Sequence, residues 1–297
     1  MTTTSAGHGM GVPVAKKRLG QHFLADSEVA REIVRASGVG PGDRVVEIGP
    51  GPGALTGWLL RAAGRVWAIE LDAELLPVLL HRTAGLGALH VERTDALRVD
   101  YGALAQTLGG ELRIVANLPY NISTPLLMRF IEQRAAIVQM TLMVQTEVAE
   151  RLYARPGTKA YGALSVPCGL WMEIEPVLHV PPGAFRPPPK VNSTVVRLTR
   201  RAAPLAQVDD PEIFSRVVRA AFGQRRKVLA NALRVMGDPA RQWLERAEID
   251  PERRGETLSI PEFARLANVI HASGESGSPE ASPDPSPTIM NADPMQG

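Results

Sequence analysis

Apolar residues in the first two thirds of the chain change from helical spacing to short β-branched runs and back again. Val29, Ile33 and Val34 recur at helical spacing after Asp26 and Ser27, either of which can cap a helix. The runs that follow are too short for helices and are bounded by turn residues, which is typical of strands. Strands are predicted at residues 43–48, 65–69, 89–92, 113–116 and 141–145. Because helical segments separate these strands, we expect a parallel α/β sheet of the Rossmann-like kind.

The sequence pattern changes near residue 190. A proline-rich segment there is followed by apolar residues at the spacing typical of short helices. Helices are predicted at residues 211–236 and 260–272. We therefore expect a sheet domain over residues 16–190 and a smaller helical domain over residues 191–272. Residues 1–15 are expected to be a flexible tail. Residues 273–297 are rich in Ser, Pro and Gly, cannot bury much apolar surface, and are expected to be a disordered tail.

Composition narrows the class of protein. The chain has 297 residues, of which 44% are hydrophobic and 22% are charged, as in ordinary folded proteins. Cys168 is the only cysteine, so the chain can form neither an intrachain disulfide nor a zinc site with several cysteines. A single cysteine is in keeping with the reducing cytoplasm. No apolar run resembles a signal peptide or reaches the roughly 18 residues of a membrane span. We expect a cytoplasmic protein that does not enter a membrane and is monomeric when free.

A glycine-rich turn follows the first predicted strand and indicates a nucleotide-like ligand. Gly49 and Gly51 lie where the strand passes into a helix and where a ligand must approach the backbone closely. Such a turn alone is also found as a plain structural turn or in dehydrogenases. Glu70, 21 residues after Gly49, follows the second strand, where its carboxylate can accept hydrogen bonds from ribose hydroxyls. Asp95 follows the third strand and can accept from an adenine amine, although either acid alone is also typical of a solvated strand end.

The spacing of the glycines favours one cofactor. Dehydrogenases carry G-x-G-x-x-G, whereas this chain has G-x-G-x-G after the strand residue Glu47. This pattern favours S-adenosylmethionine over NAD.

The segment Asn117-Leu118-Pro119-Tyr120 ends the strand predicted at residues 113–116 and is the most specific chemical signal in the chain. An adenine N6 amine is a poor nucleophile because its lone pair is delocalised into the ring. The Asn117 side-chain oxygen and a backbone carbonyl held by Pro119 can each accept one amine hydrogen and orient the nitrogen. Tyr120 can stack on the base. The alternative is a simple turn after a buried strand, but the order of Gly49, Glu70, Asp95 and Asn117 favours a methyltransferase that needs no metal.

Taken together, five motifs resemble the KsgA-type ribosomal RNA adenine dimethyltransferases over roughly residues 16–271. The motifs are Gly20-Gln21-His22-Phe23-Leu24, Glu47 to Gly53, Asn117 to Pro125, Lys159-Ala160-Tyr161-Gly162 and Phe185 to Val191. The resemblance implies cofactor contacts from His22, Leu24, Gly49, Glu70, Asp95 and Asn117, and contacts of Asn117 and Tyr120 with the target base. It also implies dimethylation of two adjacent adenines in a hairpin near the 3′ end of small-subunit (16S) ribosomal RNA, in the immature small subunit. Position 22 is His, where Asn is also found in the family.

Residues that contact RNA are predicted in the carboxyl third. A target adenine must leave its stack to reach the cofactor, and Phe185 is the candidate ring opposite Tyr120, although it can equally be a core residue. Residues 186–254 hold 15 Lys or Arg against 8 Asp or Glu. This excess predicts a phosphate-binding surface, with contacts from Lys190 and from Arg225, Arg226 and Lys227 on the predicted helix. A charged run is also common on a merely solvated face.

Three other functions share parts of this pattern. The first is methylation of large-subunit RNA by the related macrolide-resistance enzymes, which the motif from Phe185 to Val191 disfavours. The second is an assembly factor that acts mainly by docking on immature subunits. The third is a small-molecule methyltransferase, for which a basic second domain would be superfluous. A methylation assay with RNA from each ribosomal subunit separates the first alternative. A deletion phenotype that an Asn117→Ala protein fully restores would support the second.

Overall fold

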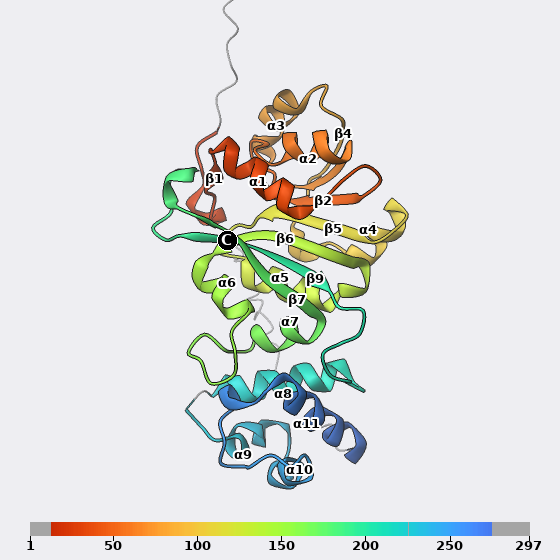
Figure 1. Ribbon diagram of the computed structural model, residues 1–297, viewed down its shortest axis with the longest axis vertical. Coiled ribbons are helices and arrows are strands. Elements are labelled where there is room, and N and C mark those ends of the chain that lie inside the picture. The colour runs from red at the N-terminus through yellow and green to blue at the C-terminus, as the bar shows by residue number, and fades with distance from the viewer. Residues whose placement is uncertain (1–12, 225, 275–297) are drawn as a thin grey trace, which may run out of the picture.

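The computed structural model describes residues 13–224 and 226–274, and these form two parts joined along the long axis of the molecule. One part is a twisted sheet with helices on both faces, and the other is a cluster of helices at the opposite end (Figure 1). The strands of the main sheet are β2 (Arg44–Ile48), β3 (Arg65–Ile69), β4 (Ala88–Glu92), β5 (Leu112–Asn117), β6 (Ile137–Gln145), β7 (Met172–Val180) and β9 (Ser193–Arg200).

The helices of the sheet part are α1 (Ser27–Ser37), α2 (Thr56–Ala63), α3 (Leu76–Thr83), α4 (Tyr101–Leu108), α5 (Ser123–Glu132), α6 (Thr146–Leu152) and α7 (Ser165–Trp171). The first of them shows how local sequence sets the boundaries. The Asp26 carboxylate accepts from the N–H groups of Glu28 and Val29, and Gly38 ends α1 in a left-handed conformation. The helix predicted from Val29, Ile33 and Val34 is therefore confirmed, with Asp26 as its cap.

The main sheet has the order β4-β3-β2-β5-β6-β9-β7 within the described residues. Strands β4 to β6 are parallel, as predicted, but β9 runs antiparallel to both β6 and β7. The Rossmann-like α/β fold is therefore confirmed, and the predicted parallel sheet becomes mixed at this edge. Strands β3 and β4 are added on one side of β2, and β5 and β6 on the other side, so the strand order switches direction at β2. This switch places a crevice at the carboxyl ends of β2 and β5. Open α/β sheets bind ligands at such a crevice.

Strand β9 lies beyond residue 190, where the boundary between the two domains was predicted. It pairs with β6 from Gln139↔Thr199 to Gln145↔Ser193, and its apolar residues Val195, Val196 and Leu198 are buried. The main sheet therefore takes a strand from the segment that was assigned to the helical domain. The helices of the second part begin only at Pro211.

The predicted helix over residues 211–236 is interrupted. Helix α8 (Pro211–Gly223) ends before the basic run, and α9 (Leu229–Ala232) and a short 3-10 turn (Leu233–Met236) follow it. Glycine is a poor helix former, and the polar residues after Gly223 have no apolar face to bury, so nothing stabilises a continuous helix there. Arg226 and Lys227 consequently lie in a loop and not on the predicted helix. Helices α10 (Ala240–Arg246) and α11 (Ile260–Ser273) complete this part.

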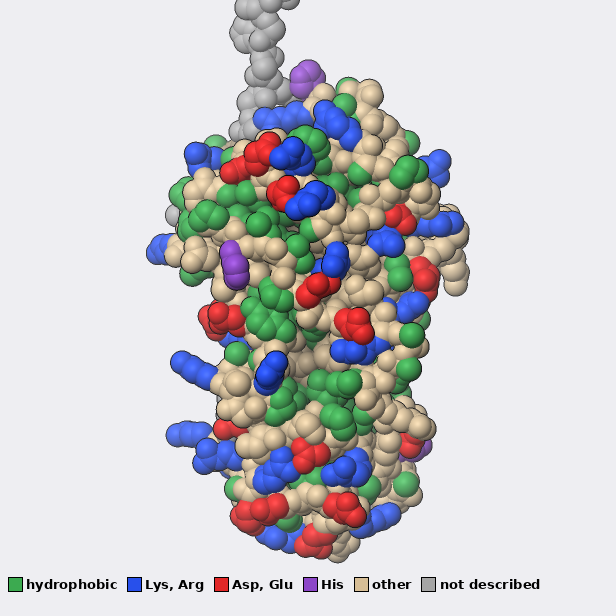
Figure 2. All heavy atoms as spheres, viewed as in Figure 1, with side chains coloured by type: hydrophobic (Ala, Val, Ile, Leu, Met, Phe, Trp, Pro, Cys, Tyr) green, Lys and Arg blue, Asp and Glu red, His purple; other side chains and the backbone are tan. Residues whose placement is uncertain are grey.

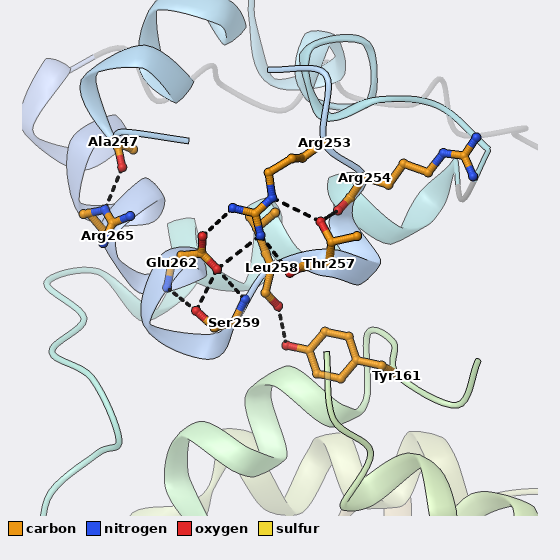
Figure 3. Close-up of polar contacts among 9 residues, drawn as sticks. All are labelled: Tyr161, Ala247, Arg253, Arg254, Thr257, Leu258, Ser259, Glu262 and Arg265. Carbon is orange, nitrogen blue, oxygen red and sulfur yellow. Dashed lines mark hydrogen bonds and ion pairs between the residues drawn. The ribbon is translucent and has the colours of Figure 1, made fainter. Parts of the chain in front are cut away.

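Tyr161 joins the two parts of the molecule (Figure 3). Its side chain is buried among apolar residues of the helical part, and its hydroxyl donates to the Leu258 carbonyl at 2.9 Å. Nearby, Ser259 caps α11 in a reciprocal arrangement with Glu262, which also binds Arg253. Burial would raise the pKa of Glu262, but hydrogen bonds from Arg253 and Ser259 lower it to about 2. The junction is thus apolar with a charged, hydrogen-bonded rim.

Candidate cofactor and catalytic site

A pocket lies at the carboxyl ends of β2, β3, β4 and β5, where parallel strands of this sheet order are expected to bind a ligand. The empty space inside it is about 880 Å³, part of which is open to solvent. Most of the cofactor and catalytic residues predicted from the sequence line it. These are His22, Gly49, Gly51, Glu70, Asp95, Asn117, Leu118, Pro119 and Tyr120.

The glycine turn and Glu70 form one wall of the pocket. Gly51 has a φ of +57°, and a Cβ there would lie 3.3 Å from the Phe23 ring, so glycine fits both the backbone and the close approach. The Glu70 side chain is buried and accepts from the Gly51 N–H at 3.1 Å and from the Asp72 N–H at 2.8 Å. Burial raises the pKa of Glu70, and these backbone hydrogen bonds oppose the rise. Each carboxylate oxygen has a further lone pair for a ribose hydroxyl.

Glu47 lies beneath the glycine turn and is only 1% exposed. Its Oε2 atom and the Thr56 hydroxyl have no hydrogen-bond partner among the described residues. Burial raises the pKa of Glu47 to about 8; the nearby Thr56 hydroxyl opposes this rise, and the charge of Glu70 adds to it. The side chain is therefore mainly protonated at neutral pH.

Asp95 begins a short 3-10 turn after β4, and its Oδ1 accepts from the Leu97 N–H at 3.0 Å. Asp95 also lines the pocket, and its second oxygen is left to accept a hydrogen bond from a ligand. Leu71, a large apolar side chain that is 53% exposed, lines the same region directly after Glu70. Leu71 is not among the residues predicted from the sequence, although its place directly after a strand-end acid is a signal for it.

Asn117 ends β5, and its amide has a defined orientation. Its Nδ2 donates to the His22 carbonyl at 3.0 Å, and a carbonyl can only accept, so the side-chain oxygen Oδ1 is left to accept. The Leu118 side chain is buried and its N–H donates to Met143 at 3.1 Å. Its carbonyl oxygen takes part in no hydrogen bond within residues 13–224 and 226–274. Two hydrogen-bond acceptors, the Asn117 Oδ1 and the Leu118 carbonyl, therefore come from neighbouring residues, and both residues line the pocket.

Tyr120 is held at its ring and at its hydroxyl. The hydroxyl lies 2.6 Å from the Ser193 hydroxyl at the start of β9, and Ser193 is fully buried. The ring stacks with His22, with centroids 5.3 Å apart. His22 is itself fixed by a contact of 2.8 Å between its Nδ1 and the Pro187 carbonyl.

Two predicted site residues do not line the pocket. Phe185 is 0% exposed and packs in the core around α1, so in this structure it cannot form a second stacking face opposite Tyr120. The sequence prediction for Phe185 is therefore wrong for this conformation, and the ring that stacks with Tyr120 is His22. Leu24 is also buried in the core and does not line the pocket, whereas its neighbour Phe23 does. Both Phe185 and Leu24 belong to a small two-stranded sheet of β1 (Phe23–Leu24) and β8 (Phe185–Arg186).

The predicted RNA-binding residues lie outside this pocket. Lys190 is exposed in the loop between β8 and β9, and Arg226 and Lys227 are exposed in the loop after α8. None of these three has an ion-pair partner among the residues that the structure describes. Arg225 lies outside the described residues. In Figure 2, acidic side chains lie among the Lys and Arg side chains at the helical end, so the positive charge on this face is not continuous.

The sheet order and the site at its switch point define a Rossmann-like methyltransferase. A family model described as "Ribosomal RNA adenine dimethylase" matches residues 13–272. Ribosomal RNA small subunit methyltransferase A of Magnetococcus marinus is 52% identical over 88% of this chain and 93% of its own length. The protein of that name from Moorella thermoacetica is 49% identical, over 86% and 93%.

Solved structures agree with this relationship. A dimethyladenosine transferase from Plasmodium falciparum is similar with a TM-score of 0.71 and 25% identity, over 85% of this chain and 98% of that one. The 23S rRNA methyltransferase ErmE is similar with a TM-score of 0.61 and 26% identity, over 84% and 99%. The chain therefore belongs to the ribosomal RNA adenine dimethylase family. It is an rRNA adenine dimethyltransferase whose methyl donor is S-adenosylmethionine.

Proposed function

We propose that this chain dimethylates the N6 amines of two adjacent adenosines in a hairpin near the 3′ end of small-subunit ribosomal RNA, late in assembly of the small subunit. The relatives that are about half identical to it over most of their length bear the name of small-subunit methyltransferases. The structural observation that carries the proposal is the pair of free acceptors at positions 117 and 118, which line the same pocket as the glycine turn and Glu70.

The residues of the pocket fit S-adenosylmethionine. Glu70 would accept hydrogen bonds from the ribose hydroxyls, Asp95 would accept one from the adenine amine, and Leu71 would offer an apolar surface to the adenine ring. The backbone of Gly49 and Gly51 leaves room for the amino-acid end. When bound, this cofactor supplies a methyl group on a positively charged sulfur, which needs no metal to activate it.

The chemical task of the protein is to position the target amine. The Asn117 Oδ1 and the Leu118 carbonyl each accept one N6 hydrogen, so that the nitrogen lone pair points toward the methyl group. The Tyr120 ring stacks on the base, and its hydrogen bond to Ser193 and its contact with His22 hold it in place. After transfer, the nitrogen releases its extra proton to solvent.

The RNA is expected to bind through exposed basic side chains. We assign this role to Lys190, Arg226 and Lys227, and to Arg225 on sequence grounds. Phosphate contacts supply affinity without sequence information, so RNA shape and the extruded bases determine the target. We further propose that the free protein is a monomer in the cytoplasm, where its buried Cys168 stays reduced. No helix among the described residues is long and apolar enough to cross a membrane.

The first test is transfer of labelled methyl groups from S-adenosylmethionine to small ribosomal subunits that lack the modification. We expect labelled dimethyladenine in small-subunit RNA and none in large subunits. Asn117→Ala should reduce transfer by about 100-fold, because the amine loses an acceptor that orients it. Asn268→Ala, on α11 away from the pocket, is the matched control and should stay active. Transfer to large subunits alone would instead support an activity like that of ErmE.

A further inference from the structure

The segment Lys16–Leu24, here called the N-terminal strap, lies across the cofactor pocket. Residues 19–23 line the pocket together with the glycine turn, Glu70 and Asn117. The strap contains a 3-10 turn, Lys17–Leu19, and ends in β1. The strap therefore forms one wall of the pocket, beside the part that is open to solvent.

The carboxyl end of the strap is fixed by backbone contacts. Strand β1 pairs with β8, and the Ala25 N–H donates to the Ala184 carbonyl at 2.8 Å. The His22 carbonyl accepts from the Asn117 amide at 3.0 Å. The position of the strap and the orientation of Asn117 therefore depend on each other.

Two hydrogen bonds from side chains of the strap meet at Asp72, and the Asn121 amide also donates to the Arg18 carbonyl at 3.4 Å. The Lys16 ammonium donates to Asp72 Oδ1 at 2.7 Å, and the Gln21 amide donates to Asp72 Oδ2 at 3.1 Å. The Lys16 N–H also donates to Gln21 Oε1 at 2.7 Å, which joins the two donors. The Asp72 side chain is 5% exposed and that of Lys16 is 23% exposed, so solvent screens this ion pair less than a surface pair. Glu74, the second acid near Lys16 at 3.0 Å, is 68% exposed.

Asp72 is also connected to the ribose-binding carboxylate. Its N–H donates to Glu70 Oε1 at 2.8 Å, two residues along the chain. Burial alone would raise the pKa of Asp72, but hydrogen bonds from Lys16 and Gln21 outweigh it and lower this pKa. The carboxylate is thus charged at neutral pH and holds both donors of the strap.

We propose that Asp72 is a positioning residue that latches the N-terminal strap over the bound cofactor, through Lys16 and Gln21, and thereby couples the ribose site at Glu70 to the catalytic Asn117. The inference rests on the assignment of this pocket to S-adenosylmethionine. Each adenosine takes two methyl groups, so the used cofactor must leave between transfers. Opening and closing of the latch then accompanies every exchange of cofactor.

The test uses the full chain and compares variants of the latch. Asp72→Asn keeps the ability to cap the turn at residues 73–75 but removes the charge that binds Lys16. Lys16→Gln removes the other partner, and Lys16→Arg restores the charge. Glu74→Gln is the matched control, because it changes an exposed acid next to the same lysine. Thermal unfolding of each variant without cofactor shows whether the fold is kept.

Two measurements report on the latch without any RNA. The first is the dissociation constant of S-adenosylmethionine, which we expect to rise about tenfold in Asp72→Asn and Lys16→Gln, because a charge-assisted hydrogen bond is lost. Lys16→Arg and Glu74→Gln should change it less than about threefold. The second is trypsin cleavage after residues 16, 17 and 18, identified by mass spectrometry. The cofactor should slow this cleavage in the wild type and much less in Asp72→Asn.

The outcomes separate the latch from the function of the pocket. Wild-type affinity and wild-type protection in both Asp72→Asn and Lys16→Gln would overturn the latch while leaving the methyltransferase assignment intact. Absence of S-adenosylmethionine binding by the wild type would overturn both. Weaker binding without faster cleavage in the strap would also overturn the latch, because the strap would not have been released.

Discussion

Glu47, near the end of β2 and next to the glycine turn, is a buried acid whose protonation depends on folding. Its pKa is raised by burial to about 8, well above the ordinary value of 4.5 that it regains on unfolding. Between these two values the folded protein binds the proton more tightly than the unfolded chain does. The free energy of unfolding should therefore fall as the pH rises from about 4.5 to 8. Above pH 8 the titration of Glu47 causes no further change.

Glu47→Gln removes this titration while keeping the shape of the side chain. Between pH 5 and 8 the unfolding free energy of the wild type should fall, relative to that of Glu47→Gln, by on the order of a few kcal/mol. The variant therefore gains relative stability at the higher pH. Denaturant titrations at several pH values measure it. The matched control is Glu132→Gln, at an exposed position, which should follow the wild type. Parallel curves for wild type and Glu47→Gln would show that Glu47 does not titrate in this window.

Single residues were predictable where the backbone alone fixes their place. Gly49, Glu70 and Asn117 follow buried strands, and parallel strands bring their carboxyl ends to one edge, so order in the sequence was sufficient. Phe185 was not predictable in this way. Its motif is the same whether the ring faces the pocket or the core, and that choice depends on how β8 pairs with β1. The stacking of His22 on Tyr120 likewise joins residues 98 positions apart.

Among the elements, the loop after α8 carries the basic side chains predicted to bind RNA. Arg226→Gln with Lys227→Gln should weaken binding to small ribosomal subunits and lower the slope of log affinity against log salt by about 1 to 2, because up to two phosphate contacts are lost. Binding of S-adenosylmethionine should be unchanged, since neither residue lines its pocket. Filter binding at several salt concentrations measures the slope.

A control for this prediction removes one positive charge elsewhere in the helical part. Arg241→Gln removes an exposed arginine that pairs with Glu252 at 2.8 Å. Its positive charge is already partly compensated, so we expect a smaller change in the salt slope. An equal loss of slope in both variants would mean that the loop is not a specific phosphate contact.

The elements that the sequence left uncertain are those decided by tertiary contacts. Strand β7 contains Pro176 and many exposed positions, and it is a strand because it pairs with β9 at the sheet edge. Strand β9 follows a proline-rich segment, which resembles a domain linker in sequence. In contrast, β3 and α11 were predicted almost to the residue, because strong turn residues and a capping box bound them.

At the scale of the whole molecule, the two parts must keep a fixed relation if RNA held at the helical end is to place its adenines at the pocket. Tyr161 is central to this relation, because its hydroxyl donates to Leu258 from the other side of the junction (Figure 3). Tyr161→Phe leaves the buried Leu258 carbonyl without this donor. We expect the free energy of unfolding to fall by about 1–2 kcal/mol.

The same variant separates positioning from cofactor binding. The pocket is formed by the strand ends and the N-terminal strap, so affinity for S-adenosylmethionine should stay unchanged in Tyr161→Phe. Methyl transfer to small subunits should fall several-fold, because a looser junction lets the RNA surface move relative to Asn117. Tyr153→Phe is the matched control, since its hydroxyl has no hydrogen bond within the described residues. If Tyr161→Phe methylates subunits at the wild-type rate despite its lower stability, then the junction contributes to folding alone, and the relation between the two parts is set by the RNA itself.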